Sequence, residues 1–267
     1  MAIEFVGYGV ATAAANAGTS IDLTALTGGI GSAAEADDIV LLLRTSTVGM
    51  SSLDLSVSGY TRRTNLAPGV AFNDTVNHEV FWKLMPGTPD TSITLPLASV
   101  IAAQSAIALV FRGVDLTTPF DATDATVTST STAIPNPAQI TTATDDAVAV
   151  VMASSNSGDT TVTSPSGYST AIAVTIGDST SYACYKSVPT AGAENPAAFT
   201  NITNPSGADI YACTTLALRP AGGTGGYIKV WNGSAWVAKP VKVWNGSAWV
   251  QKPVKRWNGS NWIATPY

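Results

Sequence analysis

The sequence predicts an all-β protein, a jelly-roll-like antiparallel β-sandwich with an internal duplication, followed by a C-terminal tail of β-hairpins. Short apolar runs follow one another about every 8 to 12 residues with Gly, Pro, Asn and Asp between them, which is typical of strands in a sandwich. Only 12% of the residues are charged, whereas surface helices normally carry rows of Glu and Lys. A 13-residue unit with Asn-Gly at its centre occurs three times at the C-terminus, and Asn-Gly between β-formers is the strongest short-range hairpin signal.

Residues 1–219 are expected to form the sandwich body, with four strands at the centre of its core. These four runs are apolar at almost every position, so neither face of such a strand suits contact with water. They cover residues 39–43, 106–111, 147–151 and 214–218. Because each half of the body has too few strands to close a core alone, we expect one sandwich rather than two independent domains.

Two motifs occur twice, 108 residues apart, and indicate that the body is duplicated, with halves at about residues 1–115 and 121–219. One motif is an acidic pair before an apolar strand, first at Asp37 and Asp38, and the other is Ser-Gly-Tyr, first at residues 58–60. The second copies are Asp145 and Asp146, and residues 166–168. We expect both acidic pairs to lie at turns that precede strands.

The tail, residues 227–267, follows a Gly-rich linker at residues 220–226 and holds six of the seven tryptophans at a fixed spacing. Each 13-residue unit is expected to form one hairpin. If Asn-Gly makes a two-residue type I′ turn, Trp231 lies opposite Ser234, and if Asn-Gly-Ser-Ala makes a four-residue turn, Trp231 lies opposite Trp236. The ring positions are Trp231, Trp236, Trp244, Trp249, Trp257 and Trp262, and the turn positions are Asn232, Gly233, Asn245, Gly246, Asn258 and Gly259.

The tryptophan rings need partners, because a two-stranded hairpin is marginally stable in water. Three partners fit the rings: other rings within a fibre, a host-surface polysaccharide gripped together with the lysines, or single-stranded nucleic acid. The tail has a formal charge of +6, from six basic residues and no acid, and the body, with 18 acids and seven bases, has −11. We expect inter-subunit burial or glycan binding, and the acidic body argues against nucleic acid.

The sequence contains no constellation that predicts an enzyme. His78 is the only histidine, no nucleophile motif accompanies it, and we expect it on the surface or in a loop. Asp115, Asp121 and Asp124 lack the regular spacing of a calcium loop and are expected to be solvated turn residues. We therefore predict no catalytic residue, no metal site and no cofactor.

Cys184 and Cys213 are predicted to be buried, unbonded hydrophobes, because they have neither CxxC spacing nor a companion His cluster. The first residues show no basic region followed by an apolar one, so we expect no signal peptide and synthesis in the cytoplasm. The longest aliphatic runs, residues 39–43 and 106–111, are far too short to span a bilayer, so no membrane partner is expected.

The body contains a series of distinctive segments, at residues 20–23, 39–43, 58–60, 81–83, 111–115 and 217–220. This series resembles a β-sandwich domain that is common in virion proteins of tailed bacteriophages and in bacterial surface proteins, over residues 1 to about 220. The Val-Trp-Asn-Gly-Ser-Ala-Trp-Val units of the tail are similar to the carboxy-terminal repeats of phage minor tail and fibre proteins. Neither resemblance supplies catalytic residues.

The two resemblances imply a structural component of a tailed phage particle, located in the virion and bound to other virion proteins. A displayed fibre, spike or minor tail protein with a polysaccharide-binding tip is the first expectation. A capsid decoration or head fibre protein is the alternative, and a carbohydrate-binding module is the second alternative. Because phage fibres are commonly trimeric and marginal hairpins would gain from three-fold packing, we also expect a homotrimer.

Overall fold

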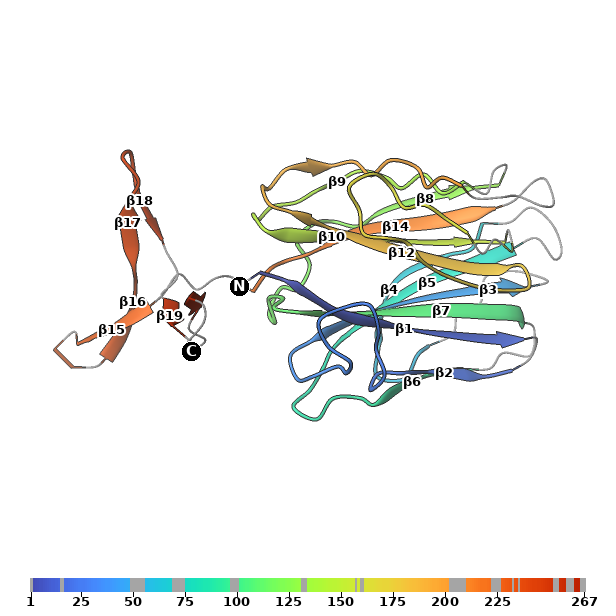
Figure 1. Ribbon diagram of the computed structural model, residues 1–267, viewed down its shortest axis with the longest axis horizontal. Helices are drawn as coiled ribbons and strands as arrows, with labels where there is room; N and C mark the ends of the chain where they lie inside the picture. The colour runs from blue at the N-terminus through green and yellow to red at the C-terminus, as the bar shows by residue number, and fades with distance from the viewer. Residues whose placement is uncertain are drawn as a thin grey trace.

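The computed structural model contains strands and no helix in the part of the chain that it describes (Figure 1). The described residues are 2–14, 17–48, 56–68, 75–96, 101–130, 134–156, 158, 161–201, 210–221, 227–231, 233–234, 236–251, 255–257 and 262–264. All strand pairs among them are antiparallel. The predicted all-β antiparallel sandwich is therefore confirmed. These residues also contain no helix that is long and apolar enough to cross a membrane.

The body consists of two five-stranded sheets stacked face to face, with a two-stranded ribbon outside each sheet (Figure 1). The first sheet has the order β1 (Glu4–Ala14), β7 (Ile101–Arg112), β3 (Ile39–Val48), β5 (Thr75–Leu84) and β4 (Thr61–Leu66). The second sheet has the order β11 (Ile172–Ile176), β12 (Ser179–Val188), β10 (Ala147–Ser155), β14 (Tyr211–Leu218) and β8 (Ala125–Ser129). The ribbons are β2 (Thr19–Asp22) with β6 (Ser92–Leu95), and β9 (Ile140–Thr141) with β13 (Ala193–Glu194).

The tail consists of three separate hairpins. They are β15 (Tyr227–Trp231) with β16 (Trp236–Pro240), β17 (Lys242–Trp244) with β18 (Trp249–Gln251), and β19 (Lys255–Trp257) with β20 (Trp262–Ala264). Each 13-residue unit therefore forms one hairpin, as expected. Residues 222–226 of the predicted linker lie outside the described residues.

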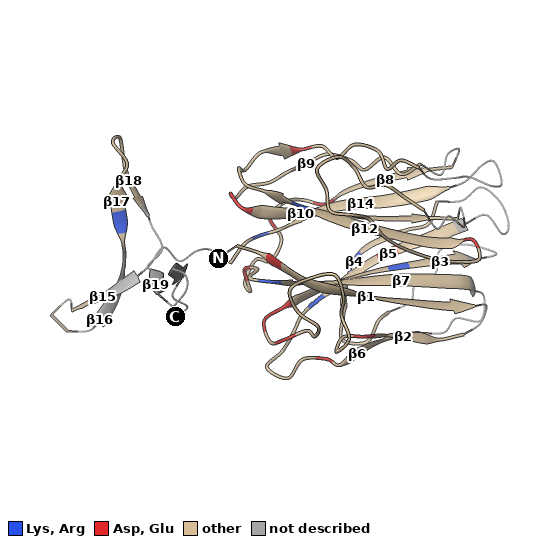
Figure 2. Ribbon diagram, viewed as in Figure 1, with Lys and Arg blue, Asp and Glu red and all other residues tan. Residues whose placement is uncertain are grey.

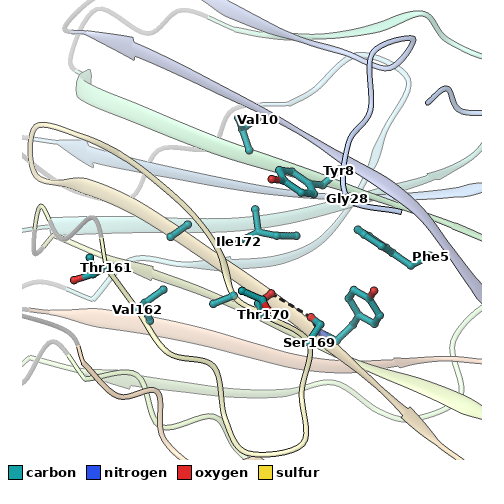
Figure 3. Close-up of a pocket in the computed structure, with 12 residues that line it drawn as sticks. Phe5, Tyr8, Val10, Gly28, Thr161, Val162, Ser169, Thr170 and Ile172 are labelled. Carbon is teal, nitrogen blue, oxygen red and sulfur yellow. Dashed lines mark hydrogen bonds between the residues drawn. The ribbon is translucent and has the colours of Figure 1, made fainter. Parts of the chain in front are cut away.

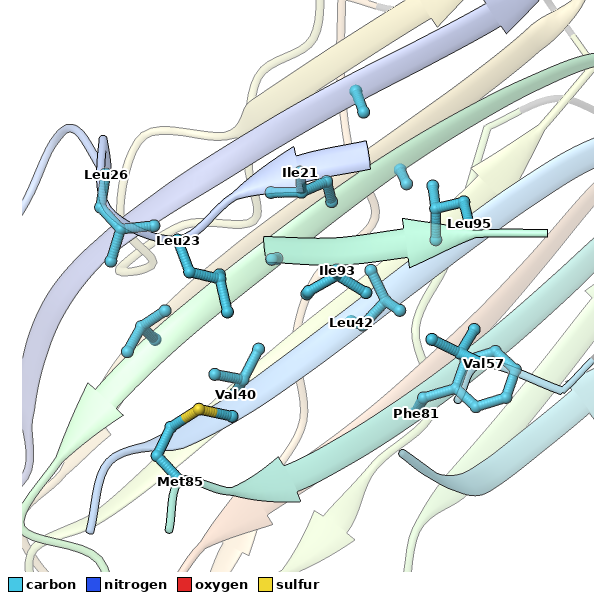
Figure 4. Close-up of a cluster of buried hydrophobic side chains, with 14 of the residues drawn as sticks. Ile21, Leu23, Leu26, Val40, Leu42, Val57, Phe81, Met85, Ile93 and Leu95 are labelled. Carbon is cyan, nitrogen blue, oxygen red and sulfur yellow. The ribbon is translucent and has the colours of Figure 1, made fainter. Parts of the chain in front are cut away.

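The central strands are apolar at every position because their two faces belong to two different cores. On β3, Ile39, Leu41 and Leu43 pack between the five-stranded sheets, whereas Val40 and Leu42 pack under the β2–β6 ribbon (Figure 4). Strands β7, β10 and β14 are buried on both faces in the same way. The prediction that the four apolar runs are central strands is confirmed. The core between the sheets contains residues of both halves, and each half also has a cluster of its own. The expectation of one sandwich rather than two independent domains stays a prediction.

The two five-stranded sheets have the same strand order when strands are matched through the offsets of the sequence motifs. Strands β1, β7, β3, β5 and β4 of the first sheet correspond to β8, β14, β10, β12 and β11 of the second. The sheets stack with β1 beside β11, and β4 beside the start of β8, where Arg63 and Asp124 meet. This correspondence supports the internal duplication, which, like the jelly-roll form, stays a prediction.

The Ser-Gly-Tyr motif makes the same contact in each half. Gly59 has a φ of 76°, a left-handed conformation that glycine adopts at no steric cost, and the ring of Tyr60 lies 5.5 Å from Nζ of Lys83. Lys83 Nζ donates to Asp90, 2.6 Å from its Oδ2. The second half repeats the contact with Gly167, Tyr168, Lys186 and Glu194. The motif therefore has a structural explanation.

Two local predictions for the body are confirmed. The acidic pairs lie at turns before β3 and β10, where Asp37 and Asp146 have φ angles of 69° and 61°, and Asp tolerates this region better than most residues. Cys184 and Cys213 are free and buried. Burial raises the pKa of both thiols, so neither behaves as an activated nucleophile.

Candidate functional site

The tail hairpins share one register, in which the two tryptophans of each unit lie directly opposite each other. Trp231 pairs with Trp236, Trp244 with Trp249, and Trp257 with Trp262. This is the register of the four-residue turn, so the two-residue type I′ alternative is wrong. Gly233 and Gly246, the second residues of their turns, have φ angles of 105° and 103°, and Asn232, Asn258 and Gly259 lie outside the described residues.

The second hairpin shows why the longer turn forms. The side-chain Oδ1 of Asn245 accepts hydrogen bonds from the backbone N–H groups of Ser247 and Ala248, at 2.9 Å and 2.8 Å. The backbone N–H of Asn245 donates to the carbonyl of Ala248 at 3.0 Å. Asn245 therefore satisfies the turn through its side chain, which Asn commonly does, and only Gly246 needs the left-handed conformation.

The described tryptophan rings of the tail are exposed. Trp231, Trp244 and Trp249 have 52%, 51% and 65% of their surface accessible, and Val243 on the opposite face of the hairpin has 49%. The rings of Trp244 and Trp249 lie 5.8 Å apart at an angle of 59°, which is a common aromatic contact. Lys242 is the first residue of β17, the short strand that also holds Trp244 (Figure 2). The hairpin thus presents apolar surface on both faces with no core of its own, which marks a contact surface.

The structure corrects the expectation for His78. It lies on β5 with no exposed surface, because the alternation of that strand turns His78 and Val80 toward the second sheet. Its Nδ1 lies 2.8 Å from Oγ of Ser154 and its Nε2 2.8 Å from Oγ1 of Thr214. Burial lowers the pKa of His78 to about 3. The ring is therefore neutral near pH 7, with one nitrogen donating and the other accepting.

The hydrogen bonds of His78 belong to a polar network between the sheets. Ser154 also contacts Thr45, and hydroxyl contacts continue from Thr45 through Ser181 to Ser105. All of these side chains are fully buried. Beyond the apolar core, the sheets are therefore joined by satisfied hydroxyl pairs, and His78 holds the sheets together rather than facing a substrate.

The three aspartates around Phe120 have different roles. Asp115 accepts hydrogen bonds from two backbone N–H groups, at 2.8 Å and 2.9 Å, and is a turn residue as predicted. Asp121 is 4% exposed and binds the Nε of Arg219 at 3.1 Å, so its assignment as a solvated turn residue is wrong. Asp124 forms an ion pair with Arg63 and is also not free in solvent. The described residues contain no group of three or more His, Cys, Asp or Glu that could hold a metal.

A groove with a volume of 660 Å³ lies between edge strands β1 and β11, and we call this place the open seam (Figure 3). A β-bulge between Phe5 and Gly7 adds one residue to β1, so Phe5 and Tyr8 share the inner face although they are three positions apart. The ring of Phe5 lies 4.5 Å from that of Tyr185. Ile172 and the loop residues Ser169 and Thr170 line the other side (Figure 3).

At the opposite edge of the sandwich, where β4 meets β8, side chains of both sheets lie against each other, and we call this place the closed seam. The rings of Trp82 and Phe120 meet edge to face at 5.1 Å. The guanidinium of Arg63 lies 3.3 Å from the centre of the Phe120 ring, and its NH2 lies 2.6 Å from Oδ1 of Asp124. An ion pair on top of an aromatic pair thus fills this seam.

The two seams match residue by residue. Matched through the pairing of their strands, Phe5 corresponds to Phe120, Tyr185 to Trp82, and Tyr8 to Asp124. Arg63 lies at a bulge between Arg62 and Thr64 that the pairing skips, and the 108-residue offset of the Ser-Gly-Tyr motifs matches it with Ala171. The aromatic pair is present in both seams. The ion pair is present in only one, because Tyr8 and Ala171 occupy its two positions in the open seam.

Comparison with known protein families, with curated proteins and with solved structures finds no match to this chain. The functional argument therefore rests on the residues themselves. Sequence reasoning identified the tryptophan hairpins but not the groove, because the groove joins segments more than 150 positions apart, such as Tyr8 and Ile172. The second Ser-Gly-Tyr motif, which directly precedes Ser169, was the only nearby signal.

Proposed function

We propose that this chain is a structural component of a tailed phage particle, as a displayed fibre, spike or minor tail protein. The observation that carries the proposal is the paired exposure of Trp244 and Trp249 on a hairpin without a core. Such a surface is costly to leave in water and is used by a protein that is held in a larger assembly. The resemblance of the tail units to phage fibre repeats points to the same kind of assembly.

The body supports this proposal as a mount for the tail. Its core continues through both five-stranded sheets, and charged residues occupy few positions on its strands (Figure 2). Its fully buried Arg44 is paired with Glu79, whose Oε2 lies 2.7 Å from NH1. The body is thus suited to hold the tail in place rather than to carry out a reaction.

The tail is the proposed contact element, either with other copies of the chain or with the host surface. Three-fold packing would cover the rings of neighbouring hairpins, which gives the proposed homotrimer. The charge of +6 on the tail would draw it to an acidic surface polysaccharide, and the indole faces would stack on sugar rings.

The direct test is mass spectrometry of purified particles from a phage whose genome encodes this chain. We expect the chain among the virion proteins, and immunogold labelling should place it on the tail of the phage particle. Absence from the particles contradicts the proposal, and labelling of the head would favour the capsid decoration or head fibre alternative.

The contact role of the tail is tested on the purified chain. Light scattering at micromolar concentration should show a trimer, and replacing Trp244 and Trp249 together by Ala should weaken both trimer formation and binding to host envelope polysaccharide. The matched control replaces both by Phe, which keeps an aromatic face at each position. A wild-type chain that is monomeric and binds no polysaccharide would contradict a contact role for the hairpins.

A further inference from the structure

We propose that the open seam is a binding site for a neutral saccharide, separate from the tail and independent of where the chain sits in a particle. The volume of the groove, 660 Å³, falls in the range of about 300 to 1,000 Å³ that is usual for small-ligand sites. Its walls combine aromatic and aliphatic side chains with hydroxyl groups. That combination is suited to a sugar, which has an apolar C–H face and a rim of hydroxyls.

The apolar wall comes from both sheets. Tyr8 and Phe5 contribute from β1, Tyr185 from β12 and Ile172 from β11. Aromatic faces carry partial negative charge and attract the polarised C–H groups of a sugar ring. In Figure 3 the side chains of β1 face those of β11 and its preceding loop across the groove, so a ring placed there would touch both sheets.

The polar wall comes from the loops beside β11. Thr161 and Thr170 are exposed at the rim, and each hydroxyl is able to donate and accept. Ser169 has a different role, because its Oγ accepts from the backbone N–H of Tyr185 at 3.1 Å and thereby fixes the loop against β12. The rim therefore offers hydroxyls on a loop that is held in place.

The charge of the groove selects a neutral ligand. None of the described residues that line it is charged, so an anionic sugar or a phosphate would find no cation there to offset the loss of its hydration. The formal charge of −11 on the body as a whole adds a repulsion against anions. This distinguishes the open seam from the basic tail.

Tyr8 is held in position before any ligand arrives. Gly28 lies against its ring with a φ of 78°, and a Cβ added there would be 2.7 Å from Cε1 of Tyr8. The backbone N–H of Tyr8 donates to the carbonyl of Thr27 at 2.9 Å, and the N–H of Thr27 donates back at 3.0 Å. A preorganised ring loses little conformational entropy on binding.

The closed seam shows that the groove is not a simple consequence of the fold. There the same frame is filled by Arg63, which contacts Phe120 and pairs with Asp124. By the 108-residue offset of the two halves, the position of Arg63 is taken in the open seam by Ala171, which lines the groove. Replacing Ala171 by Arg should therefore fill the groove with the side chain that closes the other seam.

The test is isothermal titration of the full-length chain with three neutral trisaccharides: maltotriose, cellotriose and tri-N-acetylchitotriose. We expect at least one to bind, and Ala171→Arg to weaken that binding at least about tenfold. Ala36→Arg makes the same change at an exposed turn and should leave binding unchanged. Replacing Trp244 and Trp249 by Ala should also leave it unchanged, which separates this site from the contact role of the tail.

Three results would overturn the proposal: no binding of any of the three sugars, binding unchanged by Ala171→Arg in a folded protein, or binding lost with the tail tryptophans instead. If Ala171→Arg does not fold, the joint replacement of Thr161 and Thr170 by Ala tests the rim with exposed residues. That variant should weaken binding by at least about tenfold, and unchanged binding would overturn the proposal equally.

Discussion

The two seams of the sandwich are built on the same frame and differ in what fills them. Both have an aromatic pair, Phe5 with Tyr185 in the open seam and Trp82 with Phe120 in the closed one. In the closed seam Arg63 covers Phe120, whereas in the open seam a groove remains. The aromatic pairs thus belong to the fold, and the presence or absence of the ion pair decides whether a seam can take a ligand.

The largest effect on the free energy of unfolding is expected at the two matched phenylalanines. Phe120→Ala should lower the free energy of unfolding by about 3 kcal/mol and Phe5→Ala by about 2 kcal/mol. Each ring contacts two partners, Phe120 with Trp82 and Arg63 and Phe5 with Tyr185 and Phe111. The difference arises because Phe5 also borders the groove, which leaves part of its ring without packing partners. Urea unfolding of both variants measures it, and an equal or larger loss at Phe5 would contradict the contrast between the seams.

The polar network between the sheets should make the free energy of unfolding depend on pH through His78. The unfolded chain binds a proton at His78 near its ordinary pKa of about 6.5, whereas the folded chain binds it only near pH 3. The contribution of His78 is therefore complete above about pH 6.5 and is lost as the pH falls, by about 2 kcal/mol between pH 7 and pH 5.

His78→Gln is the control for this pH dependence, because Gln also donates and accepts but does not titrate. The free energy of unfolding of the variant should fall less steeply than that of the wild type over this pH interval. If the free energies of unfolding of the two proteins fell in parallel between pH 7 and pH 5, His78 would take up its proton in the folded state as well. It would then not be buried as described.

A smaller effect is expected where the closed seam loses its ion pair. Arg63→Ala should cost about 1 to 2 kcal/mol at pH 7, because it leaves the largely buried Asp124 carboxylate without a cation. Burial raises the pKa of Asp124 and Arg63 lowers it. The deficit of the variant should therefore shrink as the pH falls and the carboxyl becomes protonated. A deficit independent of pH would mean that only the packing of Arg63 on Phe120 matters.

The smallest effect concerns an aromatic pair that no sheet supports. Asn245→Ala removes the side-chain acceptor of the second tail turn and should destabilise that hairpin by about 1 kcal/mol. The circular dichroism of the coupled indoles of Trp244 and Trp249 should weaken, and Asn245→Asp, which keeps an acceptor, should retain most of it. An unchanged signal in Asn245→Ala would show that the rings, not the turn, hold the hairpin.

Features carried by local pattern could be predicted from the sequence. Apolar runs such as residues 39–43 identified the central strands, because a strand buried on both faces has no polar position. Asn-Gly identified the hairpins, but the register depended on hydrogen bonds of Asn245 with Ser247 and Ala248 that no propensity describes. The burial of His78 was missed because its partners, Ser154 and Thr214, come from the other half of the chain.

The groove could not be predicted from the sequence because it depends on which edge strands of the two sheets lie side by side. Tyr8 and Ala171 are brought to one groove only by the stacking of the two sheets. The bulge at Gly7 that turns Tyr8 inward also has no distinctive pattern in the sequence. The contrast between the seams becomes visible only when the stacking of the sheets shows what lies beside Ala171 and Arg63, which the 108-residue offset matches.

The coupling free energy between Tyr8→Asp and Ala171→Arg tests the match between the seams most directly. If the two positions are placed as Asp124 and Arg63 are, the two new side chains should form an ion pair across the open seam. A double-mutant cycle of urea unfolding should then give a favourable coupling of about 1 kcal/mol. A coupling of zero, with both single variants folded, would show that the seams are not equivalent and would contradict the account.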